Sequence, residues 1–335
     1  PISGWLDADH LNCEHTLEST DQTSERAPMS TRLNHTLTLP ARFRLRDILA
    51  FHRRDPHQAS ERVSGTMLQK GLIWRTSPAC LAIEFDGDCA RATLSLDNPP
   101  SSEPDQLEFE SMVGRMLGFT QDIDAFERRW CEHPRLGTLI RLQSGLRVPL
   151  AASPFEALTW AITGQQISLG AAISIRRRLI EAAGIRHSVG LLCYPDPPRI
   201  MLLGEPGLRG AGFSAAKARA LLALSARVID GLLPLDEWLP APPIDTIRAA
   251  LLAVRGIGPW TVDYALLRGF GWLDGSLHGD VVVRRKLALL LASPDKPGPD
   301  ETRAWLATFS PWRALVAAHL WAMPVAQDGS AALPT

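Results

Sequence analysis

The stretch VRGIGPWTVDYALLRGFGWLDGSLHGDVVVRR, residues 254–285, decides the fold of this chain. A helical pattern over 244–253 ends just before it, and a second helical pattern begins at Pro259. Gly256 and Gly258 permit a turn with positive φ and leave bare backbone at the surface. Pro259 suits the first position of a helix, where a missing N–H group costs no hydrogen bond. The stretch therefore predicts a helix–hairpin–helix unit over residues 244–269.

The predicted hairpin presents backbone amides, and the N-terminus of the helix that follows, to an anion. A DNA phosphate suits such a surface and is bound there without any reading of the base sequence. A glycine-containing turn between two packed helices gives the same pattern with no ligand at all, and the hairpin alone leaves both interpretations open. The hairpin consists of Val254, Arg255, Gly256, Ile257 and Gly258.

The second feature of the stretch is a lone aspartate, Asp280, in front of the apolar and basic run VVVRRKLALLL. At the start of a helix its side chain caps backbone N–H groups, and the helix dipole favours an ionised carboxylate. The simple interpretation is a helix cap. The chemical interpretation is a carboxylate that stabilises positive charge on a substrate.

The string Leu-x-x-Val-x-Gly-Ile-Gly-x-x-Thr (251–261) matches the helix–hairpin–helix DNA-binding motif at each defining position. With Asp280 one helix and one loop later, the chain resembles the helix–hairpin–helix/Gly-Pro-Asp (HhH-GPD) superfamily of DNA glycosylases. Other motifs narrow the resemblance to the alkylation-repair branch, of the DNA-3-methyladenine glycosylase II type, over about residues 33–324. These motifs are SPFEALTWAITGQQIS (153–168), CYPDPPRIMLL (193–203), GFSAAKARAL (212–221) and PWRALVAAHLW (311–321).

This resemblance implies a monofunctional hydrolase that acts in base excision repair on alkylated bases of the 3-methyladenine and 7-methylguanine type. Asp280 would stabilise an oxocarbenium-like transition state and activate water. Members that also cut the strand carry a lysine two residues after the second glycine of the hairpin, where this chain has Trp260. The endonuclease III-like branch holds an iron–sulfur cluster after the aspartate, but no cysteine follows Cys193 here. We therefore expect no AP-lyase activity, no metal and no cofactor; a monovalent cation on the hairpin carbonyls is compatible with the sequence.

The resemblance also assigns residues to the DNA. A damaged base must leave the duplex to be cut out, and a cationic alkylpurine stacks well on aromatic rings. The aromatic walls of that pocket would be Trp260, Tyr264, Trp321 and Phe51, although a tryptophan on a helix also serves as core packing. The wedge that fills the gap in the duplex would be Gln166, with Gln165. Further phosphate contacts would come from Gly212, Ser214 and Lys217, where an ordinary helix start is the plainer interpretation.

The N-terminal part, residues 29–100, predicts a small antiparallel β domain, and residues 106–325 predict an α-helical body of about ten helices. In the first part LNHTLTL (33–39) alternates as a half-buried strand does, and Asp86-Gly87-Asp88 is a hairpin signal. Strands are expected around 66–74, 81–85 and 90–96, and a short helix over 43–54. The fold class is α+β, with residues 1–28 as a disordered or non-native leader upstream of Met29 and 326–335 as a tail.

Composition sets the remaining bounds. The chain is 335 residues long with a net charge of −1, but six acids against one arginine in residues 1–28 leave the remainder at +4, carried mainly by arginine. No apolar run is long enough to cross a bilayer. We expect a cytoplasmic, nucleoid-associated monomer that binds double-stranded DNA with damaged bases. The alternatives are a non-catalytic damage-binding relative, which would be expected to lose Asp280, and a glycosylase for deaminated purines.

Overall fold

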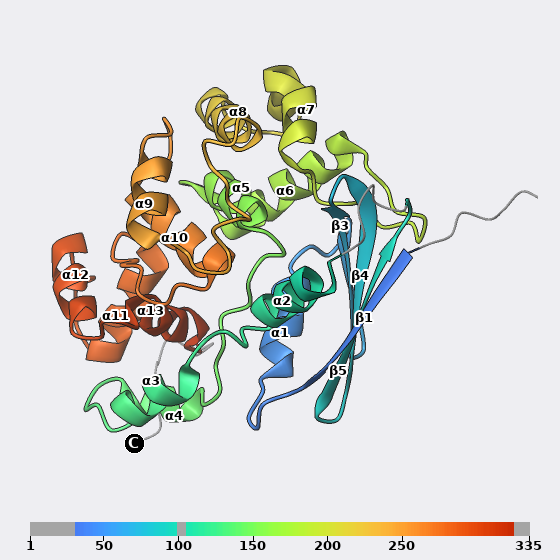
Figure 1. Ribbon diagram of the computed structural model, residues 1–335. Coiled ribbons are helices and arrows are strands. Elements are labelled where there is room, and N and C mark those ends of the chain that lie inside the picture. The colour runs from blue at the N-terminus through green and yellow to red at the C-terminus, as the bar shows by residue number, and fades with distance from the viewer. Residues whose placement is uncertain (1–30, 99–104, 325–335) are drawn as a thin grey trace, which may run out of the picture.

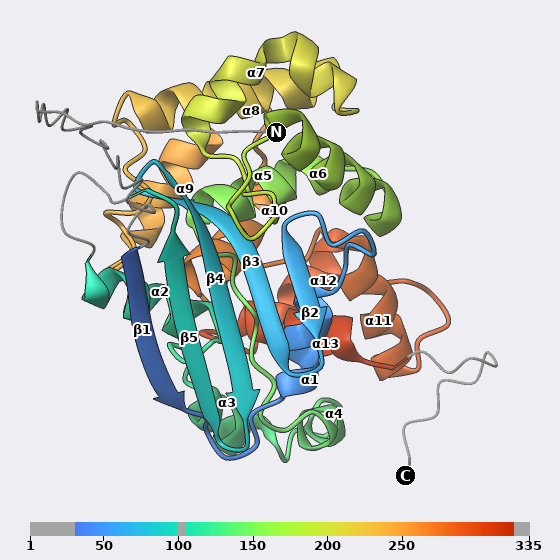
Figure 2. The same cartoon turned by 90° about the vertical axis from the view of Figure 1, so that its right-hand side faces the viewer.

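The computed structural model describes residues 31–98 and 105–324, and the expected leader and tail lie outside these ranges. A five-stranded antiparallel sheet forms the N-terminal part, in the order β1-β5-β4-β3-β2 (Figure 2). Its strands are β1 (Thr31–Thr38), β2 (Glu61–Ser64), β3 (Met67–Trp74), β4 (Ser77–Asp86) and β5 (Cys89–Leu96). The predicted α+β class is confirmed. The sequence did not indicate β2, because four residues are too few to establish an alternation.

Two helices cover one face of the sheet: α1 (Leu45–His52) and α2 (Gln106–Met116) (Figure 1). The expected turn between β4 and β5 is present, with Gly87 at a φ of +58°. The core of the sheet extends into α2, where Phe109, Val113 and Met116 are fully buried. By packing, α2 therefore belongs with the sheet, whereas its place in the sequence put it in the helical body; the domain boundaries stay a prediction.

The helical part starts at α3, and most of its helices lie where the sequence pattern predicts them. They are α3 (Ile123–Trp130), α4 (Gly137–Leu142), α5 (Pro154–Gly164), α6 (Leu169–Ala183), α7 (Pro197–Gly210), α8 (Ala215–Ile229), α9 (Ile244–Leu252), α10 (Pro259–Phe270), α11 (Val281–Leu291), α12 (Pro299–Ala307) and α13 (Arg313–Ala322). Two were not predicted: α4 is short, and α7 is interrupted by Gly204 and Pro206, which hide its periodicity. None of the described helices has the length and apolarity needed to cross a membrane.

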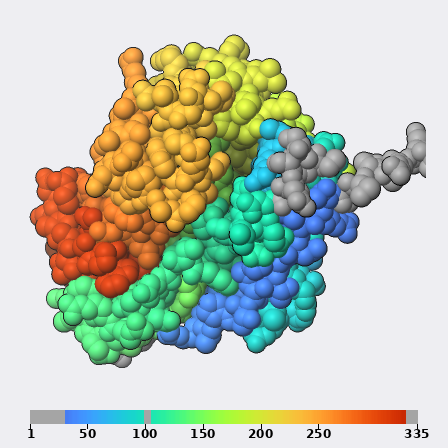
Figure 3. All heavy atoms as spheres, in the orientation of Figure 1, coloured from blue at the N-terminus to red at the C-terminus, as the bar shows by residue number. Residues whose placement is uncertain are grey.

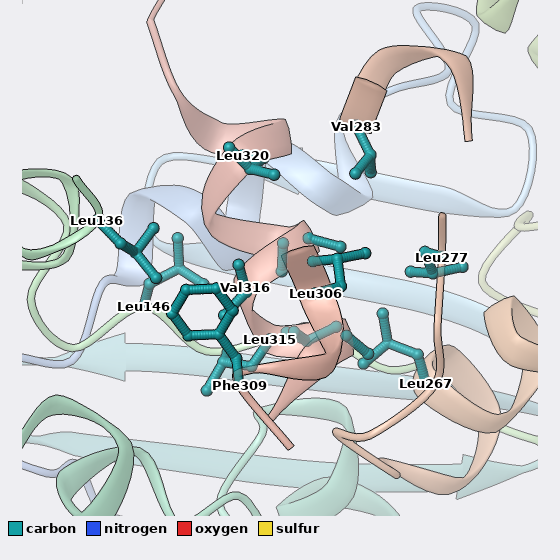
Figure 4. Close-up of a cluster of buried hydrophobic side chains, with 14 of the residues drawn as sticks. Leu136, Leu146, Leu267, Leu277, Val283, Leu306, Phe309, Leu315, Val316 and Leu320 are labelled. Carbon is teal, nitrogen blue, oxygen red and sulfur yellow. The ribbon is translucent and has the colours of Figure 1, made fainter. Parts of the chain in front are cut away.

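Two further cores hold the helices together. One surrounds α10 and joins it to α5, α8 and α9. The other is built around α13, with Phe309, Leu315 and Val316 at its centre (Figure 4). On the face that Figure 3 shows, the blue N-terminal part and the red C-terminal part form one continuous surface, with green segments between them. The sheet and the helices are thus packed into one body.

A buried network of charges fastens the sheet to the helices. Lys70 on β3 donates to Glu61 on β2 and to Glu156 on α5, each at 2.7 Å. Arg176 on α6 bonds to the same two acids, at 3.2 Å to Glu61 and 2.9 Å to Glu156. His52 on α1 adds a contact of 2.9 Å to Glu61. Five elements therefore meet at one set of ion pairs.

The charges of the network balance one another. Burial alone would raise the pKa of Glu61, but Arg176 and Lys70 outweigh it and hold that pKa well below its usual range. The pKa of Glu156 is lowered in the same way, with Lys70 as the larger cause. A buried charge is tolerated only when it has a partner of opposite sign, and here two acids face two bases.

The network yields a test of stability. In the Lys70→Met variant Glu61 and Glu156 share Arg176 alone, so the free energy of unfolding should fall by about 3–5 kcal/mol. The measurement is urea unfolding at neutral pH. Arg219→Met, which removes an exposed pair with Glu205 (3.5 Å), is the control and should leave the midpoint unchanged. Equal effects of the two variants would refute the structural role of the network.

Candidate active site

Asp280 lies at the N-terminus of α11 with both carboxylate oxygens occupied by donors. Its Oδ1 accepts from the backbone N–H groups of Val282 and Val283, each at 2.9 Å. The indole N–H of Trp321 donates to the same oxygen at 3.3 Å, and that of Trp260 donates to Oδ2 at 3.1 Å. The expected helix cap is present, but two tryptophans from α10 and α13 also hold the carboxylate. A cap alone does not need them.

The loop before Asp280 is firmly anchored, so the carboxylate is aimed by the core. Leu277 is fully buried and lies, with Val283, in the cluster around α13 (Figure 4). Earlier in the loop Asp274 accepts two bonds from Arg313, at 2.8 and 2.9 Å. The aspartate therefore stands between two buried anchors, three residues on either side. Asp280 itself is only partly buried, and Val281 beside it is 61% exposed.

Three of the four predicted pocket aromatics form a continuous row. Trp260 and Tyr264 stack with ring centroids 5.3 Å apart, and Tyr264 meets Trp321 at 6.1 Å with a tilt of 51°. Both tryptophans of the row also hold Asp280, which joins the aromatic surface to the carboxylate. Tyr264 is buried between the two tryptophans, so it contributes to core packing as well as to the aromatic row.

The fourth aromatic, Phe51 at the end of α1, is contacted by arginines. The guanidinium carbon of Arg54 lies 3.8 Å from the centre of its ring, and that of Arg268 lies 4.8 Å from it. Arg268 also lies 5.7 Å from the ring of Trp321, which connects Phe51 to the aromatic row. Nothing in the sequence connects these two arginines, although Arg268 lies within the opening stretch 254–285, because they approach the same ring from segments more than 200 residues apart.

The hairpin has the positive φ predicted for its glycines at Gly256 but not at Gly258. Gly256 has a φ of +94°, and a Cβ there would meet the Cβ of Ala220 on α8 at 2.9 Å. Gly258 is the N-cap of α10, with extended backbone, and Pro259 is the first helical residue. Val254 and Ile257 are buried in the core around α10, whereas Arg255 and Gly256 are exposed. The hairpin is therefore anchored by its buried residues, and its exposed residues remain accessible at the surface.

The predicted wedge loop follows α5, and its two glutamines differ in exposure and in hydrogen bonding. Gln166 is exposed and has a φ of +56°, an uncommon conformation for a residue with a side chain. The side chain of Gln165 instead donates to the carbonyl of Gly256 and to the hydroxyl of Thr261, both at 2.9 Å. Gln165 thus ties the loop to the hairpin, which leaves Gln166 as the residue that projects.

The third group of predicted DNA contacts, at the start of α8, lies beside the same loop. Ser214 caps the helix, accepting from the backbone N–H of Lys217 at 3.3 Å. The Lys217 ammonium donates to the carbonyl of Thr163 at 2.8 Å, and burial lowers its pKa. Gly212 is exposed with a φ of +100°. Lys217 and Gln165 therefore join three predicted contact segments into one surface.

The part of the chain that the structure describes shows no group of three or more His, Cys, Asp or Glu residues able to hold a metal ion. A cavity of about 680 Å³ lies elsewhere, bounded by α2, the N-terminus of α5 and the segment after α8. Its lining includes none of the predicted site residues, so it does not belong to this site.

The chain also matches proteins of known families. Residues 159–311 match the family model described as HhH-GPD superfamily base excision DNA repair protein. The chain is 26% identical to DNA-3-methyladenine glycosylase 2 of Escherichia coli over 238 residues, 70% of this chain and 78% of that protein. The hairpin and Asp280 thus lie in a region that matches the HhH-GPD superfamily of base excision DNA repair proteins.

Two solved structures share the fold. A 3-methyladenine DNA glycosylase from Archaeoglobus fulgidus superposes with a TM-score of 0.72 at 18% identity, over 86% of this chain and 98% of that one. The Clostridium acetobutylicum 8-oxoguanine glycosylase/lyase superposes with a TM-score of 0.65 at 16% identity, over 87% and 95%. Enzymes with and without lyase in their names thus share this architecture, and only the site residues can distinguish the reactions.

The two hairpin glycines make a matched pair for a stability test. Gly256→Ala puts a side chain at positive φ and against Ala220, so the free energy of unfolding should fall by about 1–3 kcal/mol. Gly258→Ala meets no atom within 4 Å and should be tolerated. Urea unfolding of both variants is the measurement, and a Gly256→Ala variant as stable as Gly258→Ala would contradict the hairpin geometry.

Proposed function

We propose that the chain is a monofunctional DNA glycosylase, which hydrolyses the N-glycosidic bond of alkylated bases after turning them out of the duplex. The observation that carries this proposal is the arrangement of Asp280, whose carboxylate is bonded to the indole N–H groups of Trp260 and Trp321. An anion and an aromatic surface therefore occupy one site. The relatives named as 3-methyladenine glycosylases support the choice of substrate.

Asp280 has the properties that the transition state requires. Cleavage builds positive charge on the deoxyribose, and a fixed carboxylate close to the sugar stabilises that charge. Among the described residues, Oδ1 accepts three hydrogen bonds and Oδ2 accepts one. Oδ2 therefore keeps more acceptor capacity for the attacking water or the sugar. The donors fix the carboxylate beforehand, so little reorganisation is needed during the reaction.

The DNA surface would be the one joined by Gln165 and Lys217. Hairpin amides and the N-terminus of α10 suit a phosphate, and the exposed Gln166 suits the gap left by the extruded base. The extruded base would meet the row of Trp260, Tyr264 and Trp321. These contacts hold the backbone and the base without reading the sequence around them.

The absence of strand cleavage is part of the proposal. A lyase needs an amine that forms a Schiff base with the sugar, and Trp260 cannot form one. Three of the four lysines are engaged: Lys70 in the ion network, Lys217 with Thr163, and Lys286 with the carbonyl of Met323 at 2.6 Å. Lys296 lies exposed beyond the far end of α11. No sugar adduct should be trapped by borohydride.

Replacement of the carboxylate is the decisive test. Asp280→Asn retains an oxygen that can cap α11 but removes the negative charge, so release of 7-methylguanine from methylated DNA should fall by about 10²–10³-fold or more. DNA binding should persist. The measurement is single-turnover base release, with strand nicking followed in parallel.

Asp122→Asn is the matched control, because Asp122 caps α3 through the N–H of Ala125 at 3.0 Å and has no other assigned role. It should release bases at the normal rate. Full release by Asp280→Asn would refute the catalytic assignment. A wild-type protein that binds damaged DNA but releases nothing would indicate the non-catalytic relative instead.

A further inference from the structure

The C-terminal end of α5 is held by Lys217, a residue of α8 that the family resemblance assigns to DNA. The Lys217 ammonium donates to the carbonyl oxygen of Thr163 at 2.8 Å. That carbonyl belongs to the last turn of α5, where carbonyl groups have no acceptor role within the helix. A cation at this end of a helix also meets the negative end of the helix dipole. The side chain of Lys217 therefore caps α5.

The wedge loop begins directly after this cap, and a second tie connects it to the hairpin. Gln165 donates to the carbonyl of Gly256 and to the hydroxyl of Thr261, both at 2.9 Å. The next residue, Gln166, is exposed and has a φ of +56°. A residue with a side chain keeps such a conformation only when its surroundings impose it. The ties on the two residues before Gln166 do so, and they leave its side chain pointing away from the bonds that hold the loop.

The opposite end of α5 is anchored as well. Glu156, in its first turn, accepts from Lys70 at 2.7 Å and from Arg176 at 2.9 Å. Between its ends α5 packs closely on α10, since a Cβ on Gly269 would lie 3.0 Å from the Cα of Pro154. Extrusion of a base costs stacking energy. A wedge on a helix that is fixed at both ends keeps its position while the bases unstack.

The surroundings of Lys217 favour this supporting role over a contact with DNA. Its side chain is only partly exposed, and burial lowers the pKa of the ammonium. A phosphate that drew the ammonium away from Thr163 would leave the end of α5 without its cap. Gly212 and Ser214 are exposed at the start of α8, so their backbone can meet a phosphate without Lys217.

We propose that Lys217 is a positioning residue, which holds the wedge loop through the carbonyl of Thr163 so that Gln166 can enter the duplex, and that it binds no phosphate. The inference rests on the proposed function, because it concerns the extrusion step of that reaction. Lys217 acts through Gln166 and touches neither the base nor the sugar. Without its bond the wedge loop relaxes, and a smaller fraction of the bound DNA carries its damaged base outside the helix. The number of phosphate contacts stays the same.

The experiment uses the Asp280→Asn protein, which should not release the base, and a duplex with one 7-methylguanine beside a 2-aminopurine. The fluorescence of 2-aminopurine rises when its neighbour leaves the stack, so its value at saturating protein gives the extruded fraction. Addition of Lys217→Met should lower the equilibrium constant for extrusion about tenfold, because a hydrogen bond from a charged donor is lost. Gln165→Leu, which removes the other tie, should lower it as well.

The salt dependence of binding separates positioning from a phosphate contact. Each contact between a lysine and a phosphate contributes about 0.9 to the slope of log K against log salt concentration. The slope should be the same with and without Lys217→Met. Lys296→Met is the matched control, since Lys296 lies exposed beyond the far end of α11, and it should change neither the slope nor the extruded fraction.

Two results would overturn the proposal. One is a slope that falls by about 0.9 in Lys217→Met with extrusion unchanged, as a phosphate contact gives. The other is a variant in which neither quantity changes. Both quantities are measured on bound protein, so a loss of folded protein cannot imitate the expected effect. A reference protein that gives no fluorescence rise would overturn the proposed function and this inference with it, whereas base release by Asp280→Asn would overturn the catalytic assignment alone.

Discussion

The position of the candidate site depends on one buried interaction, the ion network of Lys70, Glu61, Glu156 and Arg176. It joins two strands of the sheet to α5 and α6, and through His52 it also holds α1. Phe51 immediately precedes His52, and Arg54 follows two residues later. The N-terminal part therefore supplies Phe51 and Arg54 to the candidate site through α1, and these charges fix that part against the helices. Apolar packing could join the two parts, but a pairwise set of charges also fixes their register.

The second constraint is the double use of Asp280. As the N-cap of α11 it satisfies two backbone N–H groups, and this bonding sets the direction of its carboxylate. The core anchors Leu277 and Val283 on either side, so the same packing that closes the helical body also aims the charged group. Trp260 and Trp321 likewise make two kinds of contact, since each ring packs against Tyr264 and each indole N–H donates to the carboxylate. The site is thus made of residues that the fold already needs, which keeps it rigid.

Much of this architecture could be predicted from local sequence. The hairpin could be predicted because Gly256 and Gly258 permit a tight turn and Pro259 suits the start of a helix. The position of Asp280 at a helix start could be predicted because a lone acid precedes an apolar run. A helix with a clear cap, such as α5 with Ser153 before Pro154, can be recognised in the sequence. The pattern failed where it was short or interrupted, as in β2 and in α7 with its Gly204. It also could not place α2, whose side chains pack on the sheet although they follow the linker.

The residues that the sequence could not reveal act across the fold. Nothing local marks Arg54 and Arg268, which come together only when α1 and α10 pack. Gln165 looked like a partner of the wedge, but its amide is taken by the hairpin, a contact 91 residues distant. The bond from Trp260 to Asp280 cannot be read from the residue type, although an indole N–H that is partly buried usually finds an acceptor. The hydrogen-bond partners of such groups come from segments that are distant in the sequence, so they become visible only in the folded structure.

A crystal structure of the Asp280→Asn variant bound to a duplex with one damaged base would show directly whether Asp280 faces the sugar of an extruded nucleotide. The base should lie outside the helix, stacked against the row of Trp260, Tyr264 and Trp321, with the substituted side chain beside C1′ and a phosphate on the hairpin amides. A base that stays within the duplex, or one that enters a different part of the protein, would contradict it.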